Sequence, residues 1–208
     1  MSVVVKICGI TNVADGLAAT EAGADALGFV FCEESPRRVS VEEAGSIIRQ
    51  MPQAIVKVGV FVNAPEALVV RAIAECGLNL LQFHGDEPPA YCLQFGVMTM
   101  KAFRIRDAAS LEALLAYTTD AWLLDAYASD RRGGTGEKFN WELAVEARRL
   151  GQRPIFLAGG LKPENVAEAV RQVRPYGVDV SSGVESAPGK KDHSKVKQFI
   201  DAAKSVGD

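Results

Sequence analysis

The chain alternates eight times between a short apolar run and an amphipathic stretch, and this repeat restricts its fold more than any other feature. The apolar runs, rich in β-branched residues, lie near 3–7, 25–31, 55–62, 78–83, 98–103, 121–126, 154–158 and 177–181. The amphipathic stretches lie near 12–22, 41–50, 65–76, 88–95, 108–117, 141–150, 163–173 and 192–204. This alternation is typical of βαβ units and a parallel sheet. Eight units favour a closed (β/α)8 barrel, because doubly wound open sheets usually have about five to seven strands.

Local signals mark the ends of the expected helices. Residues that favour a helix start precede or open the amphipathic stretches: Asn12, Ser40, Asn140, Pro65, Pro88 and Pro163. Glycines fall where the helices are expected to stop: Gly23, Gly77, Gly96, Gly151 and Gly177. No linker or low-complexity segment interrupts the pattern, so we expect one α/β barrel domain spanning residues 1–208.

Composition argues against several classes of function. The chain has 208 residues, 48% of them hydrophobic, which suits one substantial core. The net charge of −3 argues against a nucleic-acid partner, and two histidines with four unpaired cysteines argue against a metal cluster. No apolar run approaches the ~20 residues of a membrane span, and the start lacks the charged region of a signal peptide. We therefore expect a cytoplasmic protein with reduced thiols that does not bind membranes.

Polar residues and glycines follow the predicted strands at their carboxyl ends, whereas the amino ends show little comparable clustering. In strand order the segments are Cys8-Gly9, 35–38, Val62-Asn63, His84-Gly85-Asp86, Arg104, Asp125 with 133–136 beyond it, Gly159-Gly160 and 181–183. The active site of a (β/α)8 barrel is built at the carboxyl ends of its strands. The asymmetry therefore predicts a functional site at this end.

The last two strand-end loops predict a phosphate site. Gly159, Gly160, Ser182 and Gly183 are small residues that let backbone N–H groups approach a ligand, and many barrels bind phosphate in these two loops. We expect the stretch 183–186 to form a short helix whose N-terminus faces the anion. Two glycines of the sixth loop are expected to supply a third edge of the site: Gly134 and Gly136. The alternative is that all these glycines are ordinary turn residues.

A thiol and a carboxylate end two separate strands, at Cys8 and Asp125. In a barrel this arrangement presents an acid/base pair across the mouth, with room for a substrate between the two groups. A lone cysteine after a strand is more often a small buried hydrophobe, and a lone aspartate is usually a cap or turn residue. A catalytic role for the pair therefore depends on the residues that surround it.

Several motifs together resemble one family, the phosphoribosylanthranilate isomerases. In chain order they are Lys6-Ile7-Cys8-Gly9-Ile10-Thr11, Gln82-Phe83-His84-Gly85-Asp86-Glu87, Leu124-Asp125, 133–136, 159–166, 178–185 and 188–192. They cover the chain from its first strand to its last helix. The resemblance implies an Amadori rearrangement in tryptophan biosynthesis, in which an aminoaldose phosphosugar becomes an aminoketose. It implies no metal and no organic cofactor.

The resemblance also implies roles for individual residues. Cys8 is the expected general base and Asp125 the expected general acid. Arg37 is expected to contact the anthranilate carboxylate in preference to the adjacent Arg38. His84 is expected either to flank the substrate or to orient its own loop through hydrogen bonds to the next two residues.

The resting protonation states of the acid/base pair oppose this chemistry, because ordinary pKa values leave the thiol protonated and the carboxylate ionised. The site must therefore lower the pKa of the thiol, raise the pKa of the carboxyl group, or do both. Lys6 shares the strand parity of Cys8, so it is expected to face the barrel interior and to lower the pKa of the thiol. Asp179 is also expected to face inward and to be one of the substrate-binding residues. We predict that it forms an ion pair with Lys6 beneath Cys8. The alternative is an inward pair without a chemical role.

The remaining candidates have less specific roles. Lys101 is expected to face inward with the parity of Phe103, in a buried network rather than as a Schiff-base lysine. Three cysteines are interpreted as structural: Cys32, Cys76 and Cys92. The segment 127–136 is a candidate lid. The chain is expected to act on a small-molecule phosphosugar as a monomer or homodimer. Another phosphosugar barrel, such as the histidine-pathway isomerase, and a non-catalytic phosphate-binding barrel are the alternative functions.

Overall fold

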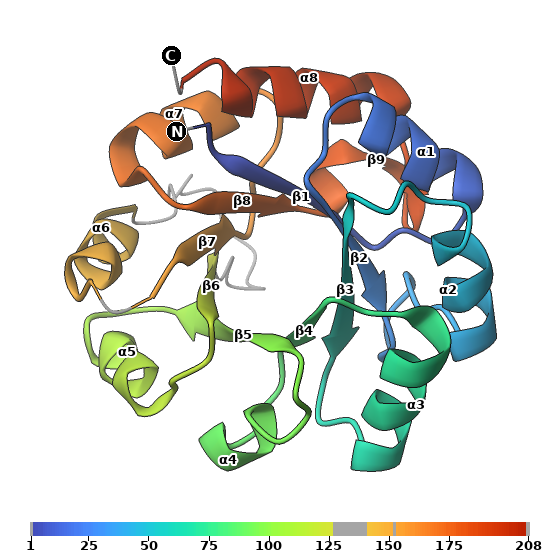
Figure 1. The fold of residues 1–208 in the computed structure, drawn as a ribbon. Helices are drawn as coiled ribbons and strands as arrows, with labels where there is room; N and C mark the ends of the chain where they lie inside the picture. The colour runs from blue at the N-terminus through green and yellow to red at the C-terminus, as the bar shows by residue number, and fades with distance from the viewer. Residues whose placement is uncertain (1, 127–140, 152, 207–208) are drawn as a thin grey trace.

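The computed structural model describes residues 2–126, 141–151 and 153–206, and in this part of the chain eight parallel strands close into a barrel (Figure 1). The strands pair in sequence order and β1 closes on β8. They are β1 Val4–Cys8, β2 Ala26–Val30, β3 Val56–Phe61, β4 Leu80–Phe83, β5 Met98–Ile105, β6 Ala121–Ala126, β7 Ile155–Ala158 and β8 Gly177–Val180. The predicted (β/α)8 fold is confirmed.

Helices surround the barrel on its outside (Figure 1). They are α1 Val13–Glu21, α2 Val41–Ile48, α3 Glu66–Cys76, α4 Pro89–Cys92, α5 Ala109–Glu112 with the 3-10 helix η1 Ala113–Ala116, α6 Trp141–Arg149, α7 Val166–Val173 and α8 His193–Lys204. The fourth and fifth helical stretches were expected over 88–95 and 108–117. The fourth is only one turn of α-helix, and in the fifth one α-helical turn passes into a 3-10 turn.

Several helix signals act as expected. Asn12 caps α1 by accepting a hydrogen bond from the Asp15 N–H at 2.9 Å, and Ser40 forms a capping box with Glu43 at the start of α2. Gly77 ends α3 in the left-handed conformation. Asn140 lies outside the described residues.

Pro163 precedes α7 by three residues, with a turn between them in which the Lys162 N–H donates to Asn165 Oδ1 at 2.8 Å. One signal was wrong. Gly177 was expected to stop α7 but is the first residue of β8. Arg174 ends that helix instead, in the left-handed conformation at φ 49°.

Side chains alternate along the strands between two apolar layers. A small cluster fills the barrel interior: Met100, Ala102, Ala121, Leu123, Phe156 and Ala158. The larger cluster joins the outer strand face to the helices, and Phe103 belongs to it. Lys101 shares the parity of Phe103, so its predicted inward direction is wrong. It is nevertheless buried, as expected, and its Nζ donates to the Gly85 carbonyl at 2.6 Å.

A hairpin follows β8 and precedes α8. After the 3-10 turn η2 Ser182–Val184, β9 Glu185–Ala187 pairs antiparallel with β10 Lys190–Lys191. The predicted short helix over 183–186 is therefore wrong beyond Val184. Pro188 and Gly189, the latter at φ 77°, lie between the two strands and turn the chain back before a helix can continue.

None of the described helices is both long and apolar enough to span a bilayer.

Candidate active site

A cavity of about 330 Å³ lies at the carboxyl ends of the barrel strands. It is lined by every predicted site residue that the structure describes: Cys8, Arg37, His84, Asp125, Gly159, Gly160, Asp179, Ser182 and Gly183. Gly134, Gly136 and the candidate lid 127–136 lie outside the described residues. Closure of the barrel thus brings residues of the first and last strands to one place, as the strand-end argument predicted.

Cys8 ends β1 directly above a buried ion pair. Lys6 Nζ lies 2.8 Å from Asp179 Oδ1, and the two residues are register partners on β1 and β8. A Cβ atom built on Gly28 would lie 2.8 Å from Cys8 Sγ and 3.0 Å from Lys6 Nζ, so the thiol and the ammonium converge over this glycine of β2. The predicted Lys6–Asp179 ion pair is confirmed.

The pKa of Cys8 is set by opposing influences. Burial raises the pKa of the thiol; the Lys6 cation lowers it and Asp179 raises it, and the net direction is upward. The pKa of Lys6 is itself raised although burial opposes this, because Asp179 and Cys8 favour its charged form. The expected lowering by Lys6 is therefore present, but burial outweighs it. Lys6 acts as a fixed cation that limits the cost of forming a thiolate.

His84 links Asp125 to the barrel interior. Its Nε2 lies 3.1 Å from Asp125 Oδ2, and its Nδ1 lies 3.2 Å from the amide nitrogen of Gln82. An amide nitrogen only donates, so Nδ1 is the acceptor and the proton of the neutral ring is on Nε2. Gln82 thereby orients His84 to donate a hydrogen bond to Asp125.

The loop after His84 is held by other residues. The Gly85 N–H donates to Glu87 Oε2 at 2.9 Å, and the Asp86 N–H donates to Asn63 Oδ1 at 2.7 Å. The alternative in which the His84 side chain orients this loop through its next two residues is therefore not what the structure shows. Its imidazole is directed to Asp125 and the cavity instead.

The predicted phosphate loops touch each other through their backbones. Gly159 and Gly160 have φ of 79° and 65°. A Cβ atom on Gly183 would overlap the carbonyl oxygen of Leu161, so only glycine lets the seventh and eighth loops approach this closely. Ser182 and Gly183 begin η2, which is only three residues long and therefore has little helix dipole. Loop backbone N–H groups, more than a helix end, are thus available to an anion.

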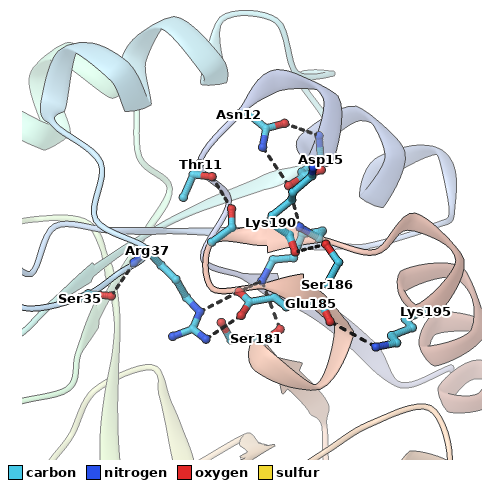
Figure 2. Close-up of polar contacts among 12 residues, drawn as sticks. Thr11, Asn12, Asp15, Ser35, Arg37, Ser181, Glu185, Ser186, Lys190 and Lys195 are labelled. Carbon is cyan, nitrogen blue, oxygen red and sulfur yellow. Dashed lines mark hydrogen bonds and ion pairs between the residues drawn. The ribbon is translucent and has the colours of Figure 1, made fainter.

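Arg37 and Arg38 lie in different environments. The Arg37 side chain extends to the cavity, and its Nε and Nη2 each lie 2.7 Å from a carboxylate oxygen of Glu185 (Figure 2). Arg38 pairs with Glu33 at 2.8 Å, and its side chain is 46% exposed. The structure therefore places Arg37, and not Arg38, at the cavity.

Some functional residues were missed from the sequence. Gln82 Oε1 and Ser181 Oγ are buried without a hydrogen-bond partner among the described residues, and both side chains line the cavity. Buried polar atoms are normally paired, so both are candidates to bind substrate. Strand parity was the available signal, since Gln82 and Ser181 fall in step with residues already assigned to the interior. Cys32, expected to be structural, also lines the cavity.

Within the described ranges no three histidine, cysteine, aspartate or glutamate side chains are grouped to hold an ion.

Comparisons with known proteins agree with this geometry. The family described as N-(5'phosphoribosyl)anthranilate (PRA) isomerase matches residues 5–202. The N-(5'-phosphoribosyl)anthranilate isomerase of Pelobacter propionicus is 53% identical over 202 residues, covering 97% of this chain and 96% of the relative. The crystal structure of phosphoribosyl anthranilate isomerase from Thermotoga maritima superposes with a TM-score of 0.91 at 43% identity, covering 98% and 99% of the two chains. A second crystal structure, in complex with reduced 1-(o-carboxyphenylamino)-1-deoxyribulose 5-phosphate, has a TM-score of 0.88 at 41% identity, with 98% and 99% covered.

Proposed function

The chain belongs to the N-(5'-phosphoribosyl)anthranilate isomerase family, and on that premise we propose how the residues of its cavity divide the reaction. The enzyme converts the aminoaldose N-(5'-phosphoribosyl)anthranilate into the aminoketose 1-(2-carboxyphenylamino)-1-deoxyribulose 5-phosphate, in tryptophan biosynthesis. The observation that carries the assignment of roles is that a thiol, a carboxylate, a guanidinium and two glycine loops line one cavity.

Asp125 is the general acid in this proposal. Its proton passes to the ribose ring oxygen, the C1′–O4′ bond breaks, and the amine lone pair forms the C1′=N bond of an iminium. His84 Nε2, at 3.1 Å from Oδ2, holds the carboxyl group in place and stabilises the carboxylate left behind.

Cys8 is the general base. Its thiolate removes the proton from C2′, the electron pair forms the C1′=C2′ bond, and the iminium nitrogen becomes neutral in the resulting enolamine. The enol proton then returns to the Asp125 carboxylate while the Cys8 thiol protonates C1′, which yields the ketone and restores both groups. Lys6 supports the thiolate stage, since its cation lowers the pKa that burial raises.

The two charged ends of the substrate bind different residues of the cavity. The phosphate binds to the loops that contain Gly159, Gly160, Ser182 and Gly183, whose backbones line the cavity. The anthranilate carboxylate binds Arg37, whose planar guanidinium suits a carboxylate. Asp179 contributes indirectly, because it pairs at 2.8 Å with Lys6, the cation that supports the Cys8 thiolate.

A fluorescence assay tests this proposal. Anthranilate fluorescence is followed as purified enzyme meets freshly generated phosphoribosylanthranilate, with Cys8→Ala and Asp125→Asn measured in parallel. We expect rapid conversion by wild type and a loss of at least about 100-fold in kcat in each folded variant. A variant that keeps wild-type kcat overturns its assigned role, and a wild type that binds but does not convert favours a non-catalytic barrel.

We propose that the protein works as a monomer or a homodimer. The described free cysteines suit a reducing compartment, and we propose the cytoplasm. Light scattering after size-exclusion chromatography separates the two assembly states.

A further inference from the structure

The segment 188–192 belongs to the family resemblance but has no part in the reaction described above. In the structure it lies in the hairpin of β9 and β10 and buries a lysine: the Lys191 side chain is 0% exposed. Its Nζ lies 2.9 Å from Glu185 Oε1 and 3.2 Å from the Ser181 carbonyl oxygen. A lysine is almost never fully buried without a paired charge, so this arrangement needs Glu185.

Glu185 faces a second cation on its other side. Its side chain is 5% exposed and accepts the Nε and Nη2 hydrogens of Arg37 in a fork, both at 2.7 Å (Figure 2). A guanidinium has five N–H groups, and this fork uses only one edge. The other edge carries Nη1, for which the described residues offer no hydrogen-bond acceptor. The Arg37 side chain is 22% exposed and lines the cavity, so that edge is available to a ligand.

Resting on the proposed contact between Arg37 and the anthranilate carboxylate, we propose that Glu185 and Lys191 are positioning and specificity residues for that carboxylate. Glu185 holds the guanidinium by one edge so that the other edge presents a fixed fork to the ligand. Lys191 holds Glu185 and keeps the group of three positively charged.

The charge of the three residues explains why a second cation is needed. Arg37 and Glu185 alone form a neutral pair, which attracts an anion weakly. Lys191 raises the net charge of the group to +1, matching the single negative charge of the carboxylate. The pKa of Lys191 is lowered by burial, and Glu185 opposes this lowering.

Hydrogen bonds to the first part of the chain fix the position of the hairpin that carries Glu185 and Lys191. The Lys191 N–H donates to Asp15 Oδ2 at 2.9 Å, and Thr11 Oγ1 donates to the Gly189 carbonyl at 2.6 Å. Gly9, at φ 77°, leaves room for Arg37, since a Cβ there would lie 2.6 Å from Arg37 Cδ. Figure 2 shows Thr11, Asp15 and Arg37, which come from separate parts of the chain, gathered around Glu185 and its hairpin. A ligand carboxylate thus meets a guanidinium that is already oriented.

Two ligands isolate the carboxylate contact. One is reduced 1-(o-carboxyphenylamino)-1-deoxyribulose 5-phosphate, and the other is its anilino counterpart without the carboxylate. The ratio of their dissociation constants, measured by calorimetry, is the carboxylate factor of a variant. Properties of the ligands themselves cancel when one variant is compared with another, and a general loosening of the site weakens both ligands alike.

We expect a carboxylate factor of about 30 in wild type and about 3 in Glu185→Gln, since a charge-assisted fork loses its orientation. The direction of the change in the carboxylate factor is decisive. Glu185→Gln removes a negative charge, and by charge alone this would strengthen carboxylate binding. A factor at or above the wild-type value overturns the positioning role. Lys191→Met is also expected to bring the factor to about 3, because the group becomes neutral. A factor of about 30 in that variant overturns the role of Lys191.

Control variants separate this inference from the assignment on which it rests. Arg38→Gln, next in the chain but exposed, is expected to keep the wild-type factor. Arg37→Gln is expected to reduce the factor to about 1, and if it does not, the proposed Arg37 contact itself fails. If Glu185→Gln does not fold, the double variant Glu185→Gln/Lys191→Met leaves no unpaired buried cation and faces the same two outcomes.

Discussion

Lys6 Nζ lies 2.8 Å from Asp179 Oδ1, on the strand pair that closes the barrel beneath Cys8. The ammonium is fully buried and lowers the pKa of a thiol that burial raises. One contact therefore joins barrel closure to the chemistry of the first strand. Its removal is expected to affect stability and the pH profile separately.

Lys6→Met is expected to raise the pKa of Cys8 further, because the nearest cation is lost. In a reaction that needs a thiolate and a protonated carboxyl together, each unit of increase lowers the maximal rate about tenfold and moves the alkaline limb to higher pH. The pH dependence of kcat/KM checks this. An unchanged alkaline limb in the folded variant would leave the ion pair with a structural role only.

The same variant leaves Asp179 buried without a partner, which is expected to cost about 3–5 kcal/mol of unfolding free energy. The double variant Lys6→Met/Asp179→Asn is expected to recover part of this loss, as urea denaturation can measure. Lys197→Met, at an exposed helix pair, is the matched control and is expected to cost less than about 0.5 kcal/mol.

Gln82→Leu removes the donor that fixes the His84 tautomer. We expect kcat to fall about tenfold while the affinity for inorganic phosphate stays unchanged, because the phosphate loops are untouched. Gln172→Leu, which removes only an exposed contact with Glu168, is expected to keep wild-type kcat. Equal kcat values in the two variants would contradict a role for Gln82 in orienting His84.

Gly183→Ala places a methyl group against the Leu161 carbonyl and is expected to force the two phosphate loops apart. The cost is about 1–3 kcal/mol in stability, with a several-fold weaker inhibition by inorganic phosphate. Gly77→Ala is the control for a glycine whose Cβ would meet no neighbouring atom, although its φ of 62°, unlike that of Gly183, lies in the left-handed region. It is expected to lose about 1–2 kcal/mol of stability and to keep phosphate inhibition.

Asp15→Asn tests the anchor of the hairpin. The carboxylate accepts hydrogen bonds from the Lys191 N–H and His193 Nε2, and although burial opposes it, these contacts hold its pKa below the ordinary value. We expect a loss of about 1–3 kcal/mol at pH 7.

The sign of the pH dependence follows from the lowered pKa of Asp15. The stabilisation is present above the unfolded-state pKa of about 4 and is lost as the pH falls through the folded value. The stability gap between wild type and Asp15→Asn is therefore expected to shrink in acid, as urea denaturation at several pH values can test. A gap that stays constant to pH 2.5 contradicts the prediction.

Much of the fold follows from local pattern. Eight alternations of strand and helix predict a closed parallel barrel, and closure makes β1 and β8 neighbours without any knowledge of coordinates. Strand parity then predicts the Lys6–Asp179 pair, because the period of two fixes which side chains share a face. The positions of Cys8 and Asp125 at strand ends follow in the same way.

The same parity rule failed at Lys101, where the reference residue was assigned to the wrong face. Phe103 packs toward the helices, and only the packed layers reveal this. The fourth and fifth helices are shorter than their amphipathic stretches, since tertiary packing decides how much of a weak helix persists.

Local sequence pattern is enough to predict the barrel, the end at which its site lies and the candidate acid and base. Only the folded chain shows that Arg37 pairs with Glu185, that a hairpin replaces the expected helix beyond Val184, and that burial outweighs Lys6 in setting the pKa of Cys8. The reason is physical. Periodicity and strand order depend on residues that are close in the sequence. A pKa or a charge partner depends on which residues the fold brings together in space, such as Arg37 and Glu185, which are 148 positions apart in the chain.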